Sequence, residues 1–191
     1  MNFNIRNIHK KYHRNYVLKS LNLSFESGMY LLTGVNGIGK STLLKIIAKV
    51  INPTNNNYII ESEKVAYLCE KIELVNDKPL AFLKSICKIN KVKFNIKSDL
   101  KLWNIPNINI MSLSKGNKQK VAILMMKYTK SRIYLFDEPT DSLDTRGIEL
   151  FVDLIQQLLN DKKIVIICTH EPSYFKKIAY QEIRLCSEWF V

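Results

Sequence analysis

The pattern of apolar and polar positions predicts strands at the start of the chain. Phe3 and Ile5 alternate with polar residues, and Leu21, Leu23 and Phe25 do so again. A period of two is typical of strands that bury one face. Because no helical segment separates these strands, we expect this part of the chain to be antiparallel.

Beyond residue 28, short apolar runs alternate with segments of helical periodicity. Within residues 41–50, for example, Leu43, Leu44, Ile46 and Ile47 recur on one face. Strands that alternate with helices are typical of a mainly parallel sheet with helices on its faces. Strands are expected over residues 29–33, 58–60, 65–68, 132–136 and 163–169, and helices over 41–50, 114–130 and 145–160.

The middle of the chain, from about residue 79 to residue 110, has a different character. Phe82, Leu83, Ile86 and Ile89 recur at helical spacing, and residues 100–103 could form a second short helix. Apolar residues at this spacing predict amphipathic helices. We therefore expect a small helical subdomain here.

Length and composition fit one soluble domain. The chain has 191 residues, of which 47% are hydrophobic, so a full core is possible. No apolar run reaches the roughly 18 to 20 residues needed to span a bilayer. The first six residues have no apolar signal core, and we expect a cytosolic protein. A role at the membrane would need a partner that supplies the spans.

The net charge of +12 permits nucleic acid or an anionic membrane as a neighbour. The basic residues are scattered in pairs along the chain, however, and a solvated basic surface is the more economical interpretation. Cys69, Cys87, Cys168 and Cys186 are not spaced as metal ligands, and we expect buried, reduced thiols.

A glycine-rich loop carries the clearest chemical signal. Residues 34–41, G-V-N-G-I-G-K-S, fit the pattern G-x-x-x-x-G-K-[ST], between an apolar strand and a helix. Such a loop turns backbone N–H groups and a helix N-terminus toward phosphates. We expect Lys40 to reach the β- and γ-phosphates, Ser41 to ligate Mg²⁺ and Thr42 to lie near the α-phosphate. The predicted ATP contacts in this segment are Gly34, Asn36, Gly37, Gly39, Lys40, Ser41 and Thr42.

Two carboxylates end the apolar strand at residues 132–136. Asp137 and Glu138 are adjacent, and charges at the edge of a core need a partner. We expect Asp137 to hold Mg²⁺ and Glu138 to act as the general base that takes a proton from the attacking water. The alternative is an acidic segment that caps the following helix.

Residues 113–120, L-S-K-G-N-K-Q-K, resemble the signature motif of ATP-binding-cassette (ABC) ATPases. The family consensus is L-S-G-G-Q, so Leu113, Ser114 and Gly116 are kept, whereas Lys115 and Asn117 replace Gly and Gln. In this family the motif acts in trans, on ATP held by the other cassette of a dimer. A cap at Ser114 would be its ordinary role in isolation.

The resemblance assigns further roles. Ser142 and Asp144 match the D-loop at the dimer interface, and His170 matches the switch histidine that contacts the γ-phosphate. Tyr12 matches the aromatic residue that stacks on adenine, although Tyr16 is nearby. At the Q-loop position Glu70 replaces the usual Gln, where it could still ligate Mg²⁺ or orient water.

The resemblance implies a P-loop NTPase of ABC type, with an α/β fold: a mainly parallel sheet flanked by helices, an N-terminal antiparallel β-subdomain and a short helical subdomain. Residues 1–191 would form a single ABC ATPase domain. Its catalytic core would be 1–69 and 113–191, and about 70–112 would be the short helical subdomain. Glu138, His170 and Lys40 are the predicted catalytic residues.

The implied function is that of the Mg²⁺-dependent, ATP-hydrolysing subunit of a transporter. It would dimerise with a second copy or a paralogue and act on separate polytopic membrane subunits, at the cytoplasmic face of the cell membrane. Lys115 and Glu70 favour an exporter. The alternative is a soluble ABC-type ATPase that acts on nucleic acid or ribosomes, which the net charge favours. One cassette without a heptad run argues against it, and no direct nucleic-acid contact is expected.

Overall fold

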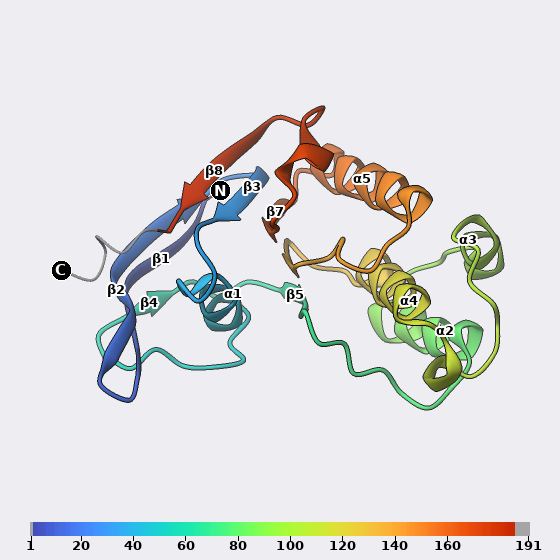
Figure 1. Ribbon diagram of the computed structural model, residues 1–191, viewed down its shortest axis with the longest axis horizontal. Coiled ribbons are helices and arrows are strands. Elements are labelled where there is room, and N and C mark those ends of the chain that lie inside the picture. Colours follow the sequence, from blue (N-terminus) through green and yellow to red (C-terminus); the bar gives the residue numbers. More distant parts are fainter. Residues whose placement is uncertain (1, 186–191) are drawn as a thin grey trace.

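A parallel five-stranded sheet forms the centre of the protein. The computed structural model describes residues 2–185 (Figure 1). The strand order is β5-β6-β7-β3-β8, and the bonded pairs run parallel, as the sequence predicted. These strands are β3 (Gly28–Thr33), β5 (Val65–Leu68), β6 (Ile133–Asp137), β7 (Ile164–Cys168) and β8 (Tyr180–Arg184).

A second, antiparallel sheet is built from the start of the chain. Its order is β2-β1-β4, and Phe3 pairs with Phe25 in the hairpin of the two long strands. The antiparallel arrangement expected there is confirmed, although both strands are longer than the alternation of a few apolar residues indicated. The strands are β1 (Phe3–Tyr12), β2 (Asn15–Phe25) and β4 (Ile59–Ile60).

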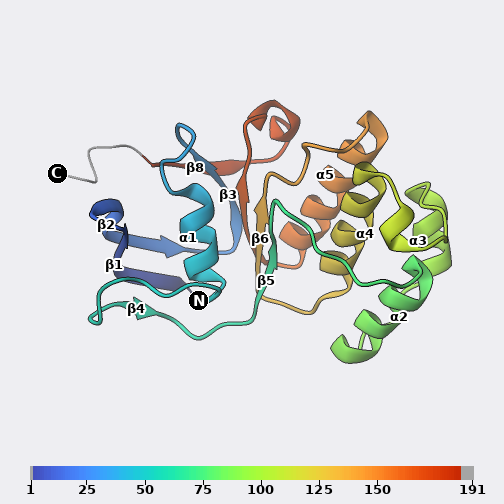
Figure 2. The same cartoon turned by 60° about the horizontal axis from the view of Figure 1, so that its bottom comes forward.

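Helices cover both faces of the central sheet. Figure 2 shows α1 between the two sheets, with α5 and α4 on the opposite face and α2 and α3 beyond them. The α-helices are α1 (Lys40–Ile47), α2 (Pro79–Asn90), α3 (Ile96–Leu102), α4 (Lys115–Tyr128) and α5 (Thr145–Asn160), and the short 3-10 helices are η1 (Ile110–Ser112) and η2 (Pro172–Phe175).

Alternation along the central strands divides the apolar core into two layers. In β6, Ile133 and Leu135 face the cluster that contains α1, whereas Tyr134 and Phe136 face the cluster that contains α4 and α5. Successive side chains of a strand point to opposite faces of the sheet. Asp137, the next residue, therefore lies on the α1 face.

The segment predicted as a helical subdomain contains α2 and α3, and Asp99 ties it to α4. The ammonium of Lys127 lies 2.9 Å from both carboxylate oxygens of Asp99, and the hydroxyl of Tyr128 donates to Oδ2 at 2.5 Å. The ring of Phe94 stacks on Tyr128. Asp99 and Lys127 hold each other in place, because the loss of either one would leave the largely buried charge of the other without a counter-charge. The division of the chain at residues 70 and 113 stays a prediction.

Further elements differ from the sequence prediction. Helix α3 spans Ile96–Leu102, so it begins before the residues 100–103 that were expected to form a short helix and ends before Trp103. Strand β8 was not predicted, because its residues are mostly polar and exposed at the sheet edge, so they show no apolar pattern. Helix α1 ends at Ile47 and not at Val50, since Lys49 adopts a left-handed conformation with φ 57°.

The cysteine prediction holds for two of the four thiols. Cys87 and Cys168 are free and buried, whereas Cys69 is free but partly exposed, so its predicted burial is wrong. Cys186 lies outside the described residues.

Candidate functional site

A cavity of about 460 Å³ opens where the carboxyl ends of β6 and β7 face the start of α1. Crevices outside the carboxyl ends of parallel strands are the usual ligand sites of such sheets. The residues that line this cavity come from the glycine-rich loop, from both sheets and from the ends of β6 and β7. These residues are Tyr12, Val17, Asn36, Gly37, Gly39, Lys40, Ser41, Thr42, Glu70, Glu138, Asp141, Cys168 and His170.

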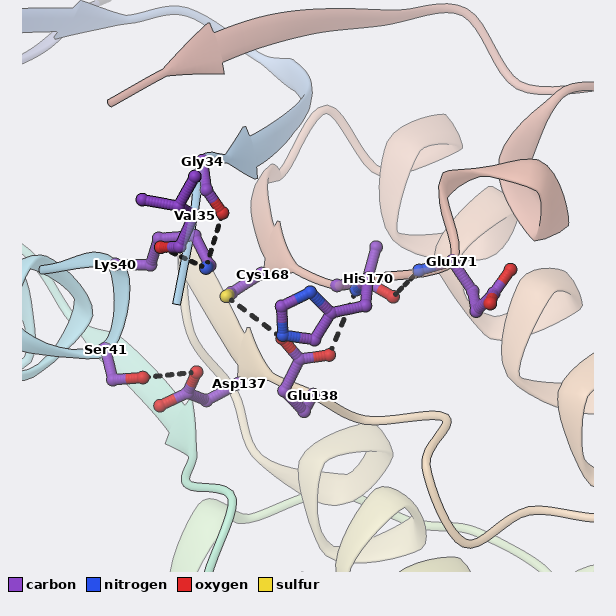
Figure 3. Close-up of polar contacts among 10 residues, drawn as sticks. Gly34, Val35, Lys40, Ser41, Asp137, Glu138, Cys168, His170 and Glu171 are labelled. Atoms are coloured by element: carbon purple, nitrogen blue, oxygen red, sulfur yellow. Dashed lines mark hydrogen bonds and ion pairs between the residues drawn. The ribbon is translucent and has the colours of Figure 1, made fainter. Parts of the chain in front are cut away.

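The glycine-rich loop is held by close contacts that a side chain would block. Gly34 and Gly39 have φ 138° and 109°, and a Cβ at Gly39 would lie 2.7 Å from a methyl carbon of Val17. The ammonium of Lys40 donates to the carbonyl oxygens of Gly34 at 2.8 Å and Val35 at 3.3 Å (Figure 3). The loop thus holds a positive charge beside the N-terminus of α1, an environment that favours a phosphate.

Asp137 is a buried carboxylate whose two oxygens accept hydrogen bonds from neutral groups. It is 1% exposed. The hydroxyl of Ser41 donates to Oδ1 at 3.0 Å and that of Tyr67 to Oδ2 at 3.2 Å. Burial, with the nearby charge of Asp137, raises the pKa of Tyr67 well above its usual range, so its hydroxyl stays a donor.

These residues fit a magnesium ion. Within residues 2–185, Asp137 forms no ion pair, and a buried carboxylate needs compensating charge. Mg²⁺ prefers one or two carboxylates together with substrate phosphates and water. Ser41 and Glu70 line the cavity, and the hydroxyl of Ser41 joins that lining to Asp137, which is buried directly behind it. The described part of the chain has no cluster of three or more His, Cys, Asp or Glu residues, so phosphate oxygens would complete such a site.

Glu138 sits in a conformation that few residues other than glycine adopt. Its φ is 47°, which costs free energy and is common at functional sites. The backbone N–H of His170 donates to Oε2 at 3.2 Å, the ring Nε2 of His170 lies 3.2 Å from Oε1, and the thiol of Cys168 donates to Oε1 at 3.4 Å (Figure 3). The carboxylate is therefore held at the cavity by three groups.

The environment of Glu138 also changes its acidity. Burial raises the pKa of Glu138 above its usual value, and the neighbouring His170 and Cys168 only partly oppose this effect. A carboxylate with a raised pKa is a stronger base at neutral pH. Glu138 and His170 thus form a direct pair in the cavity that Lys40 lines, although they follow different strands and are 32 residues apart.

Three of the predicted signature residues and both predicted D-loop residues line a separate cavity of about 400 Å³. The hydroxyl of Ser114 caps α4 by accepting from the N–H of Asn117 at 3.2 Å. A Cβ at Gly116 would lie 2.6 Å from the carbonyl oxygen of Ser142. The residues lining this cavity are Asn104, Ser114, Gly116, Asn117, Lys120, Ser142 and Asp144, and none of them lines the first cavity.

The remaining predicted residues lie around these two cavities. Leu113 is buried. Lys115 lines a third cavity of about 380 Å³, which shares Glu70, Glu138 and Asp141 with the first. Glu70 therefore lies between the residues of the first cavity and the start of α4.

The structure distinguishes the two candidate tyrosines. Tyr12 lines the first cavity and is 47% exposed. Tyr16 lies elsewhere, with the ammonium of Lys11 4.1 Å from the centre of its ring. Of these two rings, that of Tyr12 lies at the first cavity, and its stacking on adenine stays a prediction.

Sequence reasoning missed several residues of the site. Val17, Asp141 and Cys168 line the first cavity, and Tyr67 contacts Asp137. Asp141 lies in the predicted D-loop, so the resemblance to that motif could have indicated it as a site residue. The others are apolar or aromatic residues on strands, and their positions depend on strand pairing that the sequence does not display.

Comparison with known proteins identifies the family. A family model described as ABC transporter matches residues 18–141, which is more than half of the chain. The chain belongs to the ABC transporter ATP-binding family. The energy-coupling factor transporter ATP-binding protein EcfA1 of Thermotoga maritima is 28% identical over an alignment that is 214 residues long with its gaps. The alignment covers 99% of this chain and 83% of that protein.

Other relatives agree with this assignment. The lantibiotic transport ATP-binding protein SrtF of Streptococcus pyogenes is 25% identical over 92% of this chain and 82% of its own length. A dimeric structure of the ATP-binding cassette MJ0796 with ADP and phosphate superposes with TM-score 0.78, at 23% identity and 96% coverage of each chain, which supports the shared ABC fold. No helix within residues 2–185 is long and apolar enough to cross a membrane.

The raised pKa of Glu138 predicts a pH-dependent cost in stability. Because the folded pKa lies above the ordinary value of 4.5, ionisation of this carboxyl opposes folding at neutral pH. We expect Glu138→Gln to raise the thermal midpoint at pH 7 to 8. The gain should shrink as the pH falls through the folded pKa, and it should vanish below the ordinary value, where both states are protonated.

Thermal melting of both proteins between pH 4 and pH 8 measures this effect, and Glu73→Gln, at an exposed position, is the matched control. A variant that is no more stable than the wild type at pH 8 would show that burial of Glu138 carries no cost.

Proposed function

We propose that this chain is the ATP-binding and ATP-hydrolysing subunit of a transporter. One observation carries the proposal. A candidate base, Glu138, and its partner His170 share one cavity with Lys40 and Ser41 of the phosphate loop. A pure binding module would not need a carboxylate of raised pKa next to the position of a terminal phosphate.

In the proposed mechanism, the phosphate loop binds and orients ATP. Lys40 leaves its carbonyl partners for the β- and γ-phosphates, an exchange that replaces neutral acceptors by charged ones. Tyr12 stacks on the adenine, and Thr42 lies near the α-phosphate. The backbone of Gly34, Asn36, Gly37 and Gly39 surrounds the phosphates.

Oxygen ligands of this chain would contribute to holding the metal. Ser41 and Asp137 would hold Mg²⁺, directly or through water, and Glu70 is placed to contribute a further carboxylate. When bound, the ion would neutralise part of the phosphate charge.

Glu138 accepts a proton from the attacking water in this scheme. Its pair with His170 orients the carboxylate, and the His170 ring would contact the γ-phosphate of bound ATP. Proton transfer to a positioned base typically contributes a factor of about 10² to 10⁴ to the rate.

A second copy or a paralogue completes the site. The signature residues Ser114, Gly116 and Asn117 and the D-loop residues Ser142 and Asp144 line a cavity that is separate from the phosphate loop. Ser114 offers a hydroxyl and a helix N-terminus to the terminal phosphate of ATP bound by the partner. ATP binding would then close the dimer, and hydrolysis would open it.

The dimer would act on polytopic membrane subunits, on the cytoplasmic face of the membrane. Lys115 and Glu70 favour export, and the relative SrtF is named for lantibiotic transport. The net charge of +12 favours a second candidate function, that of a soluble ABC-type ATPase that acts on nucleic acid or ribosomes.

Loss of the Glu138 carboxylate should separate binding from turnover. We expect Glu138→Gln to lower the turnover number about 10²- to 10⁴-fold, since only the base is removed, and to leave the affinity for ATP close to that of the wild type. Phosphate release and equilibrium ATP binding measure the two quantities. Wild-type turnover in this variant would exclude Glu138 as the base.

Mixed dimers test whether the signature motif acts in trans. Neither Lys40→Ala nor Ser114→Arg should hydrolyse ATP alone. A mixture of the two should recover activity, because each mixed dimer contains one site with an intact Lys40 from one chain and an intact Ser114 from the other. Each variant mixed with itself is the control, and a mixture that recovers nothing would contradict action in trans.

Association with membrane subunits distinguishes the two candidate functions. We expect the tagged full-length chain to purify from detergent-solubilised native membranes with a protein that has several membrane spans, encoded beside it. Glu138→Gln with ATP should strengthen the association by holding the dimer closed. Recovery with ribosomes or RNA instead, at physiological salt, would favour the alternative.

A further inference from the structure

Tyr67 approaches Asp137 from the neighbouring strand. In the parallel pair of β5 and β6, Tyr67 lies opposite Leu135 and on the same face of the sheet, toward α1. Asp137 follows two residues later and so faces the same way. The long side chain of Tyr67 reaches this diagonal neighbour on the adjacent strand. The two oxygens lie 3.2 Å apart.

The hydroxyls of Tyr67 and Ser41 occupy different oxygens of the carboxylate. Ser41 belongs to α1 and donates to Oδ1, whereas Tyr67 belongs to the sheet and donates to Oδ2. Two donors on two oxygens fix both the position and the plane of the group. The side chain of Asp137 is thereby held from the helix and from the sheet.

Tyr67 acts without lining the nucleotide cavity. Ser41, Lys40 and Glu138 line it, but Tyr67 does not. Its ring packs, half-buried, against the apolar cluster beneath α1. Asp137 is not part of the lining either, so Tyr67 contacts the carboxylate from the sheet, whereas Ser41 contacts it from the lining of the cavity.

We propose that Tyr67 is a positioning residue for Mg²⁺, which acts by orienting the carboxylate of Asp137. The proposal rests on the function proposed above, in which Ser41 and Asp137 hold the metal. Partners that hydrogen-bond to a metal-binding carboxylate typically change metal affinity or activity about 10- to 100-fold when they are removed. Ser41 cannot replace Tyr67 in this role, because its hydroxyl is itself a metal ligand in the proposed site.

Tyr67→Phe removes one oxygen and keeps the ring. The full-length wild type and variant are titrated with a fluorescent ADP analogue, first in EDTA and then at fixed nucleotide with increasing Mg²⁺. We expect equal nucleotide affinity in EDTA and about a tenfold or greater increase in the Mg²⁺ concentration for half-maximal effect in the variant. Excess Mg²⁺ should restore most of its turnover.

Tyr30→Phe is the matched control. Tyr30 lies on β3 and faces the same cluster, but its hydroxyl bonds to the backbone of Glu26, away from Asp137. This variant should show the wild-type Mg²⁺ dependence. A second measurement is a double-mutant cycle, in which Tyr67→Phe should cause no further change once Asp137→Asn is present.

The outcomes separate this inference from the proposed function. An unchanged Mg²⁺ dependence in Tyr67→Phe, with Mg²⁺-dependent binding in the wild type, would overturn the role of Tyr67 alone. Weaker nucleotide binding in EDTA, with no shift in Mg²⁺ dependence, would assign Tyr67 a packing role and overturn it too. A wild type whose nucleotide binding ignores Mg²⁺ would overturn both proposals.

Discussion

The buried carboxylate of Asp137 is the constraint on which the site depends. A charge that is 1% exposed requires compensation, and within residues 2–185 its side-chain partners are the hydroxyls of Ser41 and Tyr67. These two bonds join the first turn of α1, the end of β6 and the neighbouring β5. The glycine-rich loop, which leads directly into α1, is therefore fixed relative to the sheet before any ligand binds.

The parallel order of the sheet then brings the other groups to this point. Since β6 and β7 are adjacent and run the same way, Glu138 and His170 leave the sheet at the same edge. The backbone N–H of Glu138 donates to the carbonyl oxygen of Cys168 at 3.0 Å, which continues the strand pairing one residue beyond β6. The unusual φ of Glu138 follows immediately after that bond and turns its side chain into the cavity.

Much of this arrangement could be predicted from the sequence, because local pattern carries it. The central strands, the main helices and the glycine-rich loop have strong periodicity or a specific motif. Strand β8 could not be predicted, since a polar edge strand is defined only by the strand it joins. The contacts of Tyr67 and Cys168 were also beyond prediction, because they depend on the register and order of strands distant in sequence.

The pairing of Asp99 with Lys127 and Tyr128 has a mechanical consequence. It joins α3 to the last turn of α4, whose first turn is capped by Ser114. A helix transmits displacement along its axis with little bending, and this one is clamped at the far end by a largely buried charge. A displacement of α3 would thus move α4 along its axis. A displacement of Ser114 would in turn move α3 through the same contacts.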